Sequence, residues 1–297
     1  MAARTGGVND VRGRLCALVP ALAVSAAAWL TACAAPVGGS VGDSPAPSPA
    51  PSHAAAPSAM IPSAAVPPVA LRWKAVLVAG DGSLPVFDNA VRRLRASLHG
   101  GAGVPASDIR RLSSDPATIA REGVEAASLA RVLGAIEGMA PAPGQGCLVY
   151  VTSHGVPGRG LALSRTGEVL TPDALDRALA AGCGDAPTVA VLSGCYTGVF
   201  VRPPVARPNR VVLSAARADR PSFGCGAGYE YTVFDRCLLD AVERGGNWGR
   251  VYGAVRGCVA DAERRSGFPP SEPRAHVGPG MDGVPVPAGA GRPAPGA

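Results

Sequence analysis

Runs of almost continuously apolar residues alternate with amphipathic stretches through the middle of the chain. An unbroken apolar run indicates a strand that is buried on both faces of a sheet. The sequence predicts such strands at residues 73–79, 148–152, 188–192 and 210–214, with a shorter one at 109–112. Apolar residues at helical spacing predict helices around residues 87–98, 129–136, 172–181, 233–238 and 251–259. Strands that alternate with helices predict an α/β fold, with a mostly parallel sheet and helices on both faces.

The first 32 residues are predicted to be a secretory signal. Arg4, Arg12 and Arg14 precede an uncharged apolar run at residues 15–30, which is short for a membrane span and typical of an export signal. The run ends in Leu30-Thr31-Ala32-Cys33, which resembles a bacterial lipobox. Lipidation of Cys33 would anchor the protein to a membrane, on the exported side of the cell envelope. The alternative is a plain signal peptide that contains an incidental cysteine.

Two segments of biased composition flank the predicted domain. Residues 33–70 are rich in proline, alanine and serine and nearly uncharged, which is typical of an extended linker. Residues 268–297 are rich in proline and glycine, and we expect a disordered tail there. The remaining residues, 71–267, have the length of one ordinary domain with a substantial core, and we expect this domain to be monomeric.

The charged residues exclude some classes of function. The formal net charge is +6, but the arginines are scattered rather than clustered beside aromatic residues, so the sequence has no basic face typical of nucleic-acid binding. The four histidines do not combine with the cysteines into a zinc-binding spacing. We therefore expect no nucleic-acid partner, no metal and no cofactor.

Two residues that can carry chemistry follow consecutive buried strands. His154 comes after the strand at 148–152, and Cys195 comes after the strand at 188–192. The carboxyl ends of parallel strands meet at one edge of a sheet, so the two side chains are expected to lie close together. A neighbouring imidazole withdraws the thiol proton and stabilises the thiolate, and Gly155 and Gly194 leave room for a substrate. The alternative is a buried structural cysteine and an unrelated loop histidine.

Three blocks in this order resemble the bacterial branch of the legumain-like (C13) peptidases, within the caspase-like clan. They are Ser153-His154-Gly155, the block from Ser193 to Gly198, and the block from Ser214 to Cys225. The resemblance covers roughly residues 73–245 and implies a caspase-like sheet. It also implies that His154 is the general base, that Cys195 forms a thioester with the substrate, and that the N–H groups of Gly155 and Cys195 bind the oxyanion.

The resemblance also suggests which residues bind the substrate, with departures from the eukaryotic pattern. Val86, Asp88 and Asn89 stand where legumains have Asn, Arg and His, so the Asn that orients the histidine is missing. Ser193 replaces an acidic residue, Glu230 matches a pocket Asp, and Ser214 begins the third block. Asp88 and Glu230 together predict an acidic pocket that accepts Arg or Lys, then Asn, ahead of Asp, before the scissile bond. The alternative is that Asp88 only caps the first helix and Asn89 supplies a neutral amide to the pocket, in which case small polar residues would be cut equally well.

The cysteines of an exported domain meet an oxidising compartment, so they are not all expected to remain thiols. Cys237 and Cys258 lie on the apolar faces of successive helices, and they form our preferred disulfide. Cys147 and Cys183 each precede a neighbouring strand and form the second candidate pair. Cys225 would then remain as the odd thiol.

The function predicted from these observations is that of a cysteine endopeptidase acting on peptides or proteins. A transamidase would use the same thioester but resolve it with an amine rather than with water. A non-catalytic binding module of the same fold is the third alternative, and the presence of both His154 and Cys195 argues against it.

Overall fold

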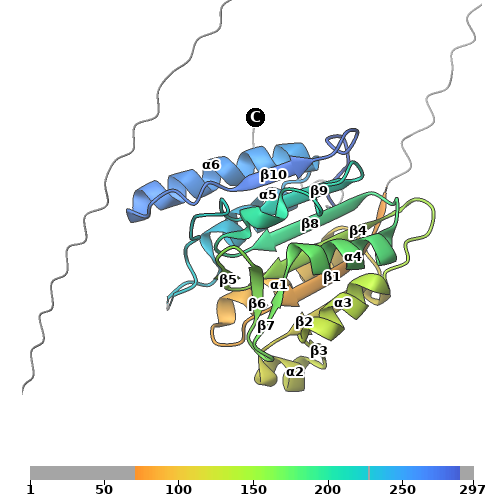
Figure 1. The fold of residues 1–297 in the computed structure, drawn as a ribbon, viewed down its shortest axis with the longest axis horizontal. Coiled ribbons are helices and arrows are strands. Elements are labelled where there is room, and N and C mark those ends of the chain that lie inside the picture. The colour runs from red at the N-terminus through yellow and green to blue at the C-terminus, as the bar shows by residue number, and fades with distance from the viewer. Residues whose placement is uncertain (1–70, 227, 288–297) are drawn as a thin grey trace, which may run out of the picture. The chain divides into compact units, whose positions relative to one another are not determined.

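Seven strands form the central sheet of the computed structural model, which describes residues 71–226 and 228–287 (Figure 1). In spatial order they are β10 (Arg274–Val277), β9 (Arg210–Ser214), β8 (Thr188–Ser193), β4 (Gln145–Thr152), β1 (Arg72–Ala79), β2 (Ile109–Ser113) and β3 (Glu125–Ala126). All neighbouring pairs are parallel except β10 with β9, which is antiparallel. The five strands that the apolar runs predict are all present, and the mostly parallel α/β sheet is confirmed.

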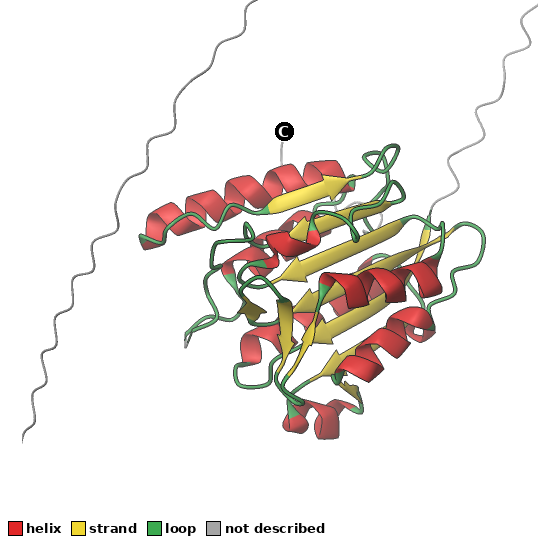
Figure 2. Cartoon of the chain, viewed as in Figure 1, coloured by secondary structure: helices red, strands yellow, loops and turns green. Residues whose placement is uncertain are grey.

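Helices cover both faces of this sheet (Figure 2). One face packs against α1 (Pro85–Ala96), α5 (Val233–Glu243) and α6 (Trp248–Ser266), and the other packs against α3 (Leu129–Glu137) and α4 (Pro172–Cys183). The five helices that the sequence predicts are therefore present. A shorter helix, α2 (Pro116–Glu122), was not predicted from the apolar spacing, because Thr118 is its one buried residue. Single helical turns occupy Ser97–Gly101, Ala106–Asp108 and Thr197–Phe200.

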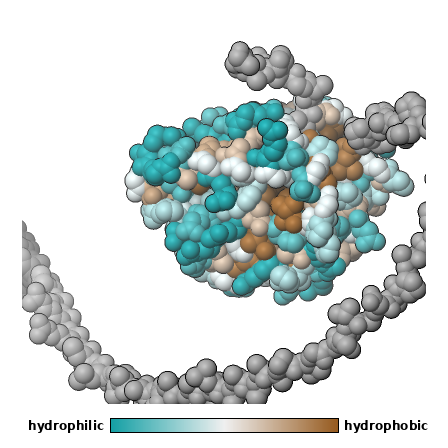
Figure 3. Space-filling view, turned by 90° about the horizontal axis from the view of Figure 1, so that it is seen from above, coloured by the Kyte–Doolittle hydropathy of each residue, from teal (hydrophilic) through white to brown (hydrophobic). Residues whose placement is uncertain are grey.

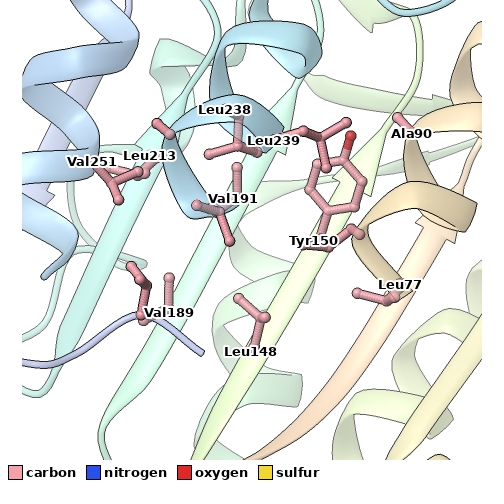
Figure 4. Packing of buried hydrophobic residues seen from close by; sticks show 14 of the residues in the cluster. Leu77, Ala90, Leu148, Tyr150, Val189, Val191, Leu213, Leu238, Leu239 and Val251 are labelled. Atoms are coloured by element: carbon pink, nitrogen blue, oxygen red, sulfur yellow. The ribbon is translucent and has the colours of Figure 1, made fainter. Parts of the chain in front are cut away.

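Branched aliphatic residues of the sheet and the helices interlock on the side covered by α5 and α6. Figure 4 shows Val191 and Leu213 from the sheet beside Leu238 of α5 and Val251 of α6. These side chains are at most 1% exposed, and burial of each is worth about 1.5 to 3 kcal/mol. The outward side of α6 is hydrophilic over much of its length, as Figure 3 shows for the face seen from above. This packing holds the strands rigid, and their carboxyl ends are the positions that carry the site.

A small antiparallel sheet follows His154. It consists of β5 (Gly155–Val156), β6 (Gly160–Leu163) and β7 (Glu168–Leu170). The Ala162 N–H donates a hydrogen bond to the His154 carbonyl, which ties this sheet to the end of β4. The backbone beside the histidine is therefore part of a hydrogen-bonded sheet rather than a free loop.

The prediction of a disordered tail from residue 268 is wrong for its first part. Residues 274–277 form β10, which pairs with β9, and Phe268 stacks on Phe223 with their ring centroids 4.5 Å apart. The strand has four residues within a proline- and glycine-rich segment, so no apolar periodicity predicts it. Its hydrogen bonds come from the backbone edge of β9, which only the assembled sheet provides. Residues 288–297, the predicted signal, Cys33 and the linker lie outside the described residues.

Both predicted disulfides are present. Cys147 of β4 is bonded to Cys183 of α4, and Cys237 of α5 is bonded to Cys258 of α6. Cys225 is a free thiol, as expected, and so is Cys195. The first bond therefore joins the sheet to a helix on one face, and the second joins the two C-terminal helices to each other.

Replacing Cys147 and Cys183 together by alanine is expected to lower the free energy of unfolding by about 3 to 4 kcal/mol, because the bond closes a loop with a sequence separation of 36. Urea unfolding of the wild type and the variant, each with and without reductant, measures the effect. Reductant should destabilise the variant less than the wild type, because only the Cys237–Cys258 bond remains in it. Equal stability of the two proteins would contradict the prediction.

Candidate active site

His154 and Cys195 lie at the same edge of the sheet, on neighbouring strands. β4 and β8 run parallel with Thr152 opposite Ser193, and the Ser153 N–H donates to the Ser193 carbonyl over 3.0 Å. Two residues beyond this pair the chain reaches His154 on one side and Cys195 on the other. Both are half-buried, whereas the residues that precede them are buried. The strand ends therefore present these two side chains together and leave them accessible.

Gly155 places the backbone after the histidine directly against the backbone of Cys195. A Cβ atom on Gly155 would lie 1.7 Å from the Cys195 carbonyl oxygen and 2.9 Å from its nitrogen. Gly194 is equally confined, since a Cβ there would lie 2.6 Å from the Ser153 carbonyl oxygen. Only glycine allows approaches this close. The two glycines flanking the dyad in sequence are thus required by the contact between the two strand ends.

The backbone turns sharply just after Cys195. Tyr196 has a φ of 61°, which is a left-handed conformation that a bulky residue rarely adopts. Its N–H donates to the Arg220 carbonyl over 2.8 Å, and the Thr197 hydroxyl donates to the Gly194 carbonyl over 2.9 Å. These hydrogen bonds hold the turn, and they direct the Cys195 side chain away from the line of β8. Backbone strain of this kind is concentrated at functional sites.

The Cys195 sulfur lies against the backbone of Ser222. The Ser222 N–H donates to Sγ over 3.3 Å, and Sγ lies 3.5 Å from the Ser222 carbonyl oxygen. A hydrogen bond donated to a thiolate favours the charged form. Ser222 was not singled out by the sequence analysis, although it lies inside the third block of the resemblance. The free thiol of Cys225 is close by, and its pKa is raised by burial and by the proximity of Cys195.

The His154 ring packs against α1. The edge of one ring meets the face of the other in a contact with Phe87, with the centroids 5.3 Å apart and an interplanar angle of 78°. Phe87 is 1% exposed, so the aromatic wall on this side of the imidazole belongs to the core. The neighbouring Val86 is buried as well. An apolar contact therefore borders the imidazole on the side of α1.

Residues 139–244 match the model of the Peptidase C13 family. The matched region is a C13-family cysteine peptidase domain. It contains β4, β8, β9 and α5, and with them both His154 and Cys195. The mostly parallel sheet with helices on both faces is consistent with the caspase-like fold of this family. None of the curated proteins matches the chain.

The residues expected to bind substrate in this C13 domain differ in their exposure. Asp88, Ser193 and Ser214 are buried, Asn89 is half-buried and Glu230 is exposed. The Ser214 hydroxyl donates to the Ala216 carbonyl over 3.1 Å, so its hydrogen-bonding capacity is used within the fold. Glu230 is thus the residue of this group whose side chain is freely accessible.

Asp88 belongs to α1 and lies on the buried face of this helix, against β2. Its Oδ2 accepts a hydrogen bond from the Ser113 hydroxyl over 2.9 Å, and burial raises its pKa. The interpretation of Asp88 as the N-cap is wrong, because α1 begins at Pro85 with Leu84 as the N-cap residue. Asp88 is only 3% exposed, so its carboxylate does not reach the surface to line the predicted acidic pocket together with Glu230.

Asn89 connects α1 to the segment before α5. Its Nδ2 donates to the Glu230 carbonyl over 3.0 Å, and its Oδ1 accepts from Arg92 over 2.5 Å. The guanidinium of Arg93 stacks over the Tyr231 ring at 5.4 Å. The backbone around Glu230 is therefore held on α1, which gives Asn89 a supporting part in this site.

Two further properties concern the described part of the chain. Residues 71–226 and 228–287 contain no group of three or more histidine, cysteine or acidic side chains that could hold a metal ion. Within the same residues, no helix has the length and apolar character needed to cross a membrane.

Proposed function

We propose that this cysteine peptidase hydrolyses peptide bonds with a dyad in which Cys195 is the nucleophile and His154 is its base. The observation that carries the proposal is the contact between the two strand ends, where Gly155 meets the Cys195 backbone with no side chain between them. At this contact, the backbone N–H groups of Gly155 and Cys195 are proposed to bind the oxyanion that forms from the substrate carbonyl. The half-buried dyad remains reachable for an extended peptide.

The reaction follows from this arrangement. His154 takes the thiol proton, and Sγ of Cys195 attacks the carbonyl carbon to form a tetrahedral oxyanion. The N–H groups of Gly155 and Cys195 hold the oxyanion. The C–N bond then breaks, the amine leaves with the proton from His154, and the acyl group stays on Cys195 as a thioester. A water molecule, deprotonated by His154, hydrolyses the thioester and regenerates the thiol.

The test of the dyad is selective labelling by a peptide acyloxymethyl ketone, which alkylates an activated thiol in a substrate-binding site. We expect the label on Cys195 and not on Cys225, the other free thiol of the described residues. His154→Ala should slow labelling strongly, because the base that generates the thiolate is lost. Labelling of Cys225 instead, or labelling of Cys195 that is independent of His154, would contradict the proposed dyad.

Glu230 is proposed to favour a cationic or amide side chain before the scissile bond. It carries an exposed carboxylate on the segment that Asn89 holds to α1, whereas Asp88 is buried against Ser113. Ser193 and Ser214 are the last residues of β8 and β9, and both are buried.

Glu230→Gln is therefore expected to reduce the preference for Arg over Gln at this substrate position by about two- to five-fold, which is the usual strength of an exposed ion pair. Asp88→Asn is the matched variant, and it should leave the preference unchanged because its carboxyl is not accessible. A fluorogenic peptide library scanned at this position measures both. If the charge preference changed in Asp88→Asn but not in Glu230→Gln, the role proposed for Glu230 would be contradicted, and the preference would depend on the buried carboxylate of Asp88.

The protein is further proposed to be exported and anchored through a lipid on Cys33, with the peptidase domain monomeric. The two disulfides support an oxidising compartment. Intact mass spectrometry of the mature protein should find Cys33 at the N-terminus with its acyl chains, and Cys33→Ser should abolish the modification. An unmodified N-terminus downstream of Cys33 would contradict the anchor, without bearing on the peptidase.

A further inference from the structure

Beneath the dyad, the last residues of four strands form a row across the sheet. Ser193 of β8 lies opposite Thr152 of β4, Thr152 lies opposite Ala79 of β1, and Ala79 lies opposite Ser113 of β2. All four are buried, and this end row faces α1 and α5, since Ala79 belongs to the core on that side. Three of the four, Ser193, Thr152 and Ser113, carry a hydroxyl. The core therefore ends in a row of polar groups two residues before His154 and Cys195.

A buried carboxylate from α5 lies over this end row. Asp235 is 0% exposed, and its Oδ2 accepts a hydrogen bond from the Thr152 hydroxyl over 2.7 Å. Its Oδ1 accepts from the Tyr150 hydroxyl, also over 2.7 Å. Figure 4 shows the Tyr150 ring extending from the sheet toward the helix layer. Successive residues of a strand alternate between its faces, so Tyr150 and Thr152 lie on the same side of β4. His154 comes two residues after the end of β4, and its ring contacts Phe87 of α1, which belongs to the core on that same side.

Several features favour the ionised form of Asp235. Each carboxylate oxygen accepts a hydrogen bond from a hydroxyl, and hydrogen bonds donated to a carboxylate favour its charged form. Asp235 also lies in the first turn of α5, where the helix dipole stabilises negative charge. Burial is the largest effect and leaves the pKa of Asp235 above its usual value, although the hydroxyls of Tyr150, Ser193 and Thr152 lower it.

The neighbours of Asp235 leave its charge without a cationic partner. Tyr150 is the titratable group in direct contact with it, and burial together with the charge of Asp235 raises the pKa of Tyr150. Of the adjoining elements, α1 presents Asp88 to Ser113, and α6 packs its apolar residues against α5. The Ser193 hydroxyl forms no hydrogen bond in the described structure, although it lies near enough to lower the pKa of Asp235. The other titratable groups at this end of the sheet are Asp81 after β1, Asp115 after β2, the thiol of Cys225 and the dyad itself.

We propose that Asp235 is a positioning residue of this peptidase, which holds the end of β4 and places a fixed negative charge below the imidazole of His154. A negative charge there stabilises imidazolium and so favours the ion pair of thiolate and imidazolium over the neutral pair. The inference rests on the proposed dyad. It adds an acid to a site in which the imidazole is bordered on the side of α1 by the apolar ring of Phe87.

The decisive variant is Asp235→Asn, which keeps the shape of the side chain and removes its charge. Loss of a proton is easier when a neighbouring negative charge is absent, and this holds both for the thiol and for imidazolium. Both limbs of the pH dependence of kcat/KM are therefore expected to move to lower pH by about 0.5 to 1 unit. The KM should change little, because Asp235 is inaccessible to substrate.

A second readout does not depend on peptide cleavage. The rate of Cys195 alkylation by iodoacetamide, followed by mass spectrometry of its peptide, rises with the thiolate fraction. Its midpoint should move to lower pH by a similar amount in Asp235→Asn. If Cys195→Ala retained peptide cleavage, the proposed dyad would fail, while the alkylation curve would still report whether Asp235 acts on the thiol.

Asp176→Asn is the matched control, because Asp176 is a nearly buried carboxylate on α4, paired with Arg210 over 2.7 Å at the far end of the sheet. It should lower stability without shifting either pH curve. Thr152→Val and Tyr150→Phe each remove one donor to Asp235, and they should shift the curves in the same direction by less. If Asp235→Asn does not fold, the shifts of the pH curves in Thr152→Val and Tyr150→Phe still test the proposal. Unshifted curves in all the folded variants would overturn the proposal and leave Asp235 a purely structural residue.

Discussion

Replacing Cys195 by alanine should abolish peptide cleavage, with kcat/KM reduced by about 10⁴-fold or more, while the protein remains folded. The loss is large because, in the proposed mechanism, the thiolate of Cys195 forms the covalent bond to the substrate. Stability should change little, since the side chain is half-buried and its contacts are with the Ser222 segment rather than with the core. Kinetics with a fluorogenic peptide and the thermal midpoint Tm measure the two effects separately.

His154→Ala should lose nearly as much activity, and the double variant should be no worse than either single one. Groups that act as a unit are not additive, so the second substitution removes little that the first has left. Cys225→Ser is the thiol control, and it should keep most of the activity although Cys225 lies near Cys195. Turnover by Cys195→Ala comparable to that of the wild type would refute the assignment of the nucleophile.

Gly155→Ala should reduce kcat/KM by at least about 10²-fold, although it adds a single methyl group. The new Cβ would lie 1.7 Å from the Cys195 carbonyl oxygen, so one of the two strand ends has to move by more than an ångström. A displacement of this size at the reacting atoms costs about two orders of magnitude in rate. It also separates the two N–H groups that are proposed to hold the oxyanion.

Gly134→Ala is the control for Gly155→Ala. Gly134 lies in α3, and a Cβ there meets nothing within 4 Å. This variant should keep full activity, and it should be more stable by about 0.5 to 1 kcal/mol, because alanine is the better helix former. Full activity of Gly155→Ala would show that the contact between the strand ends is not needed for catalysis.

The strands were predictable because parallel strands in the middle of a sheet are buried on both faces, which leaves unbroken apolar runs. β1, β4, β8 and β9 are of this kind, and the sequence places β9 at the same residues, 210–214, as the structure does. The positions of His154 and Cys195 followed from the same pattern, because each comes directly after such a run. The two disulfides were predictable for a related reason, since their cysteines flank or occupy elements with clear periodicity.

The edge of the sheet was not predictable in this way. β10 has four residues, and its burial is only partial, so it leaves no apolar signature in a segment rich in proline and glycine. Its place depends on the free edge of β9, to which it contributes hydrogen bonds through the backbone. Backbone pairing is nearly independent of side-chain identity, so the residue types of β10 do not predict that this segment forms a strand.

From the sequence alone we could derive the order of the elements and the positions of His154, Cys195 and their neighbouring glycines at the ends of two buried strands. The tertiary structure alone decided which polar residues are buried and what surrounds them. Asp88 and Asp235 both lie near the start of a helix, where a sequence suggests only a cap, yet each is covered by the sheet and bonded to a hydroxyl of it. Ser222 meets the Cys195 sulfur from a segment that follows another strand. Burial and contacts of this kind depend on which elements distant in the sequence pack together, and the local periodicity of the sequence does not predict this packing.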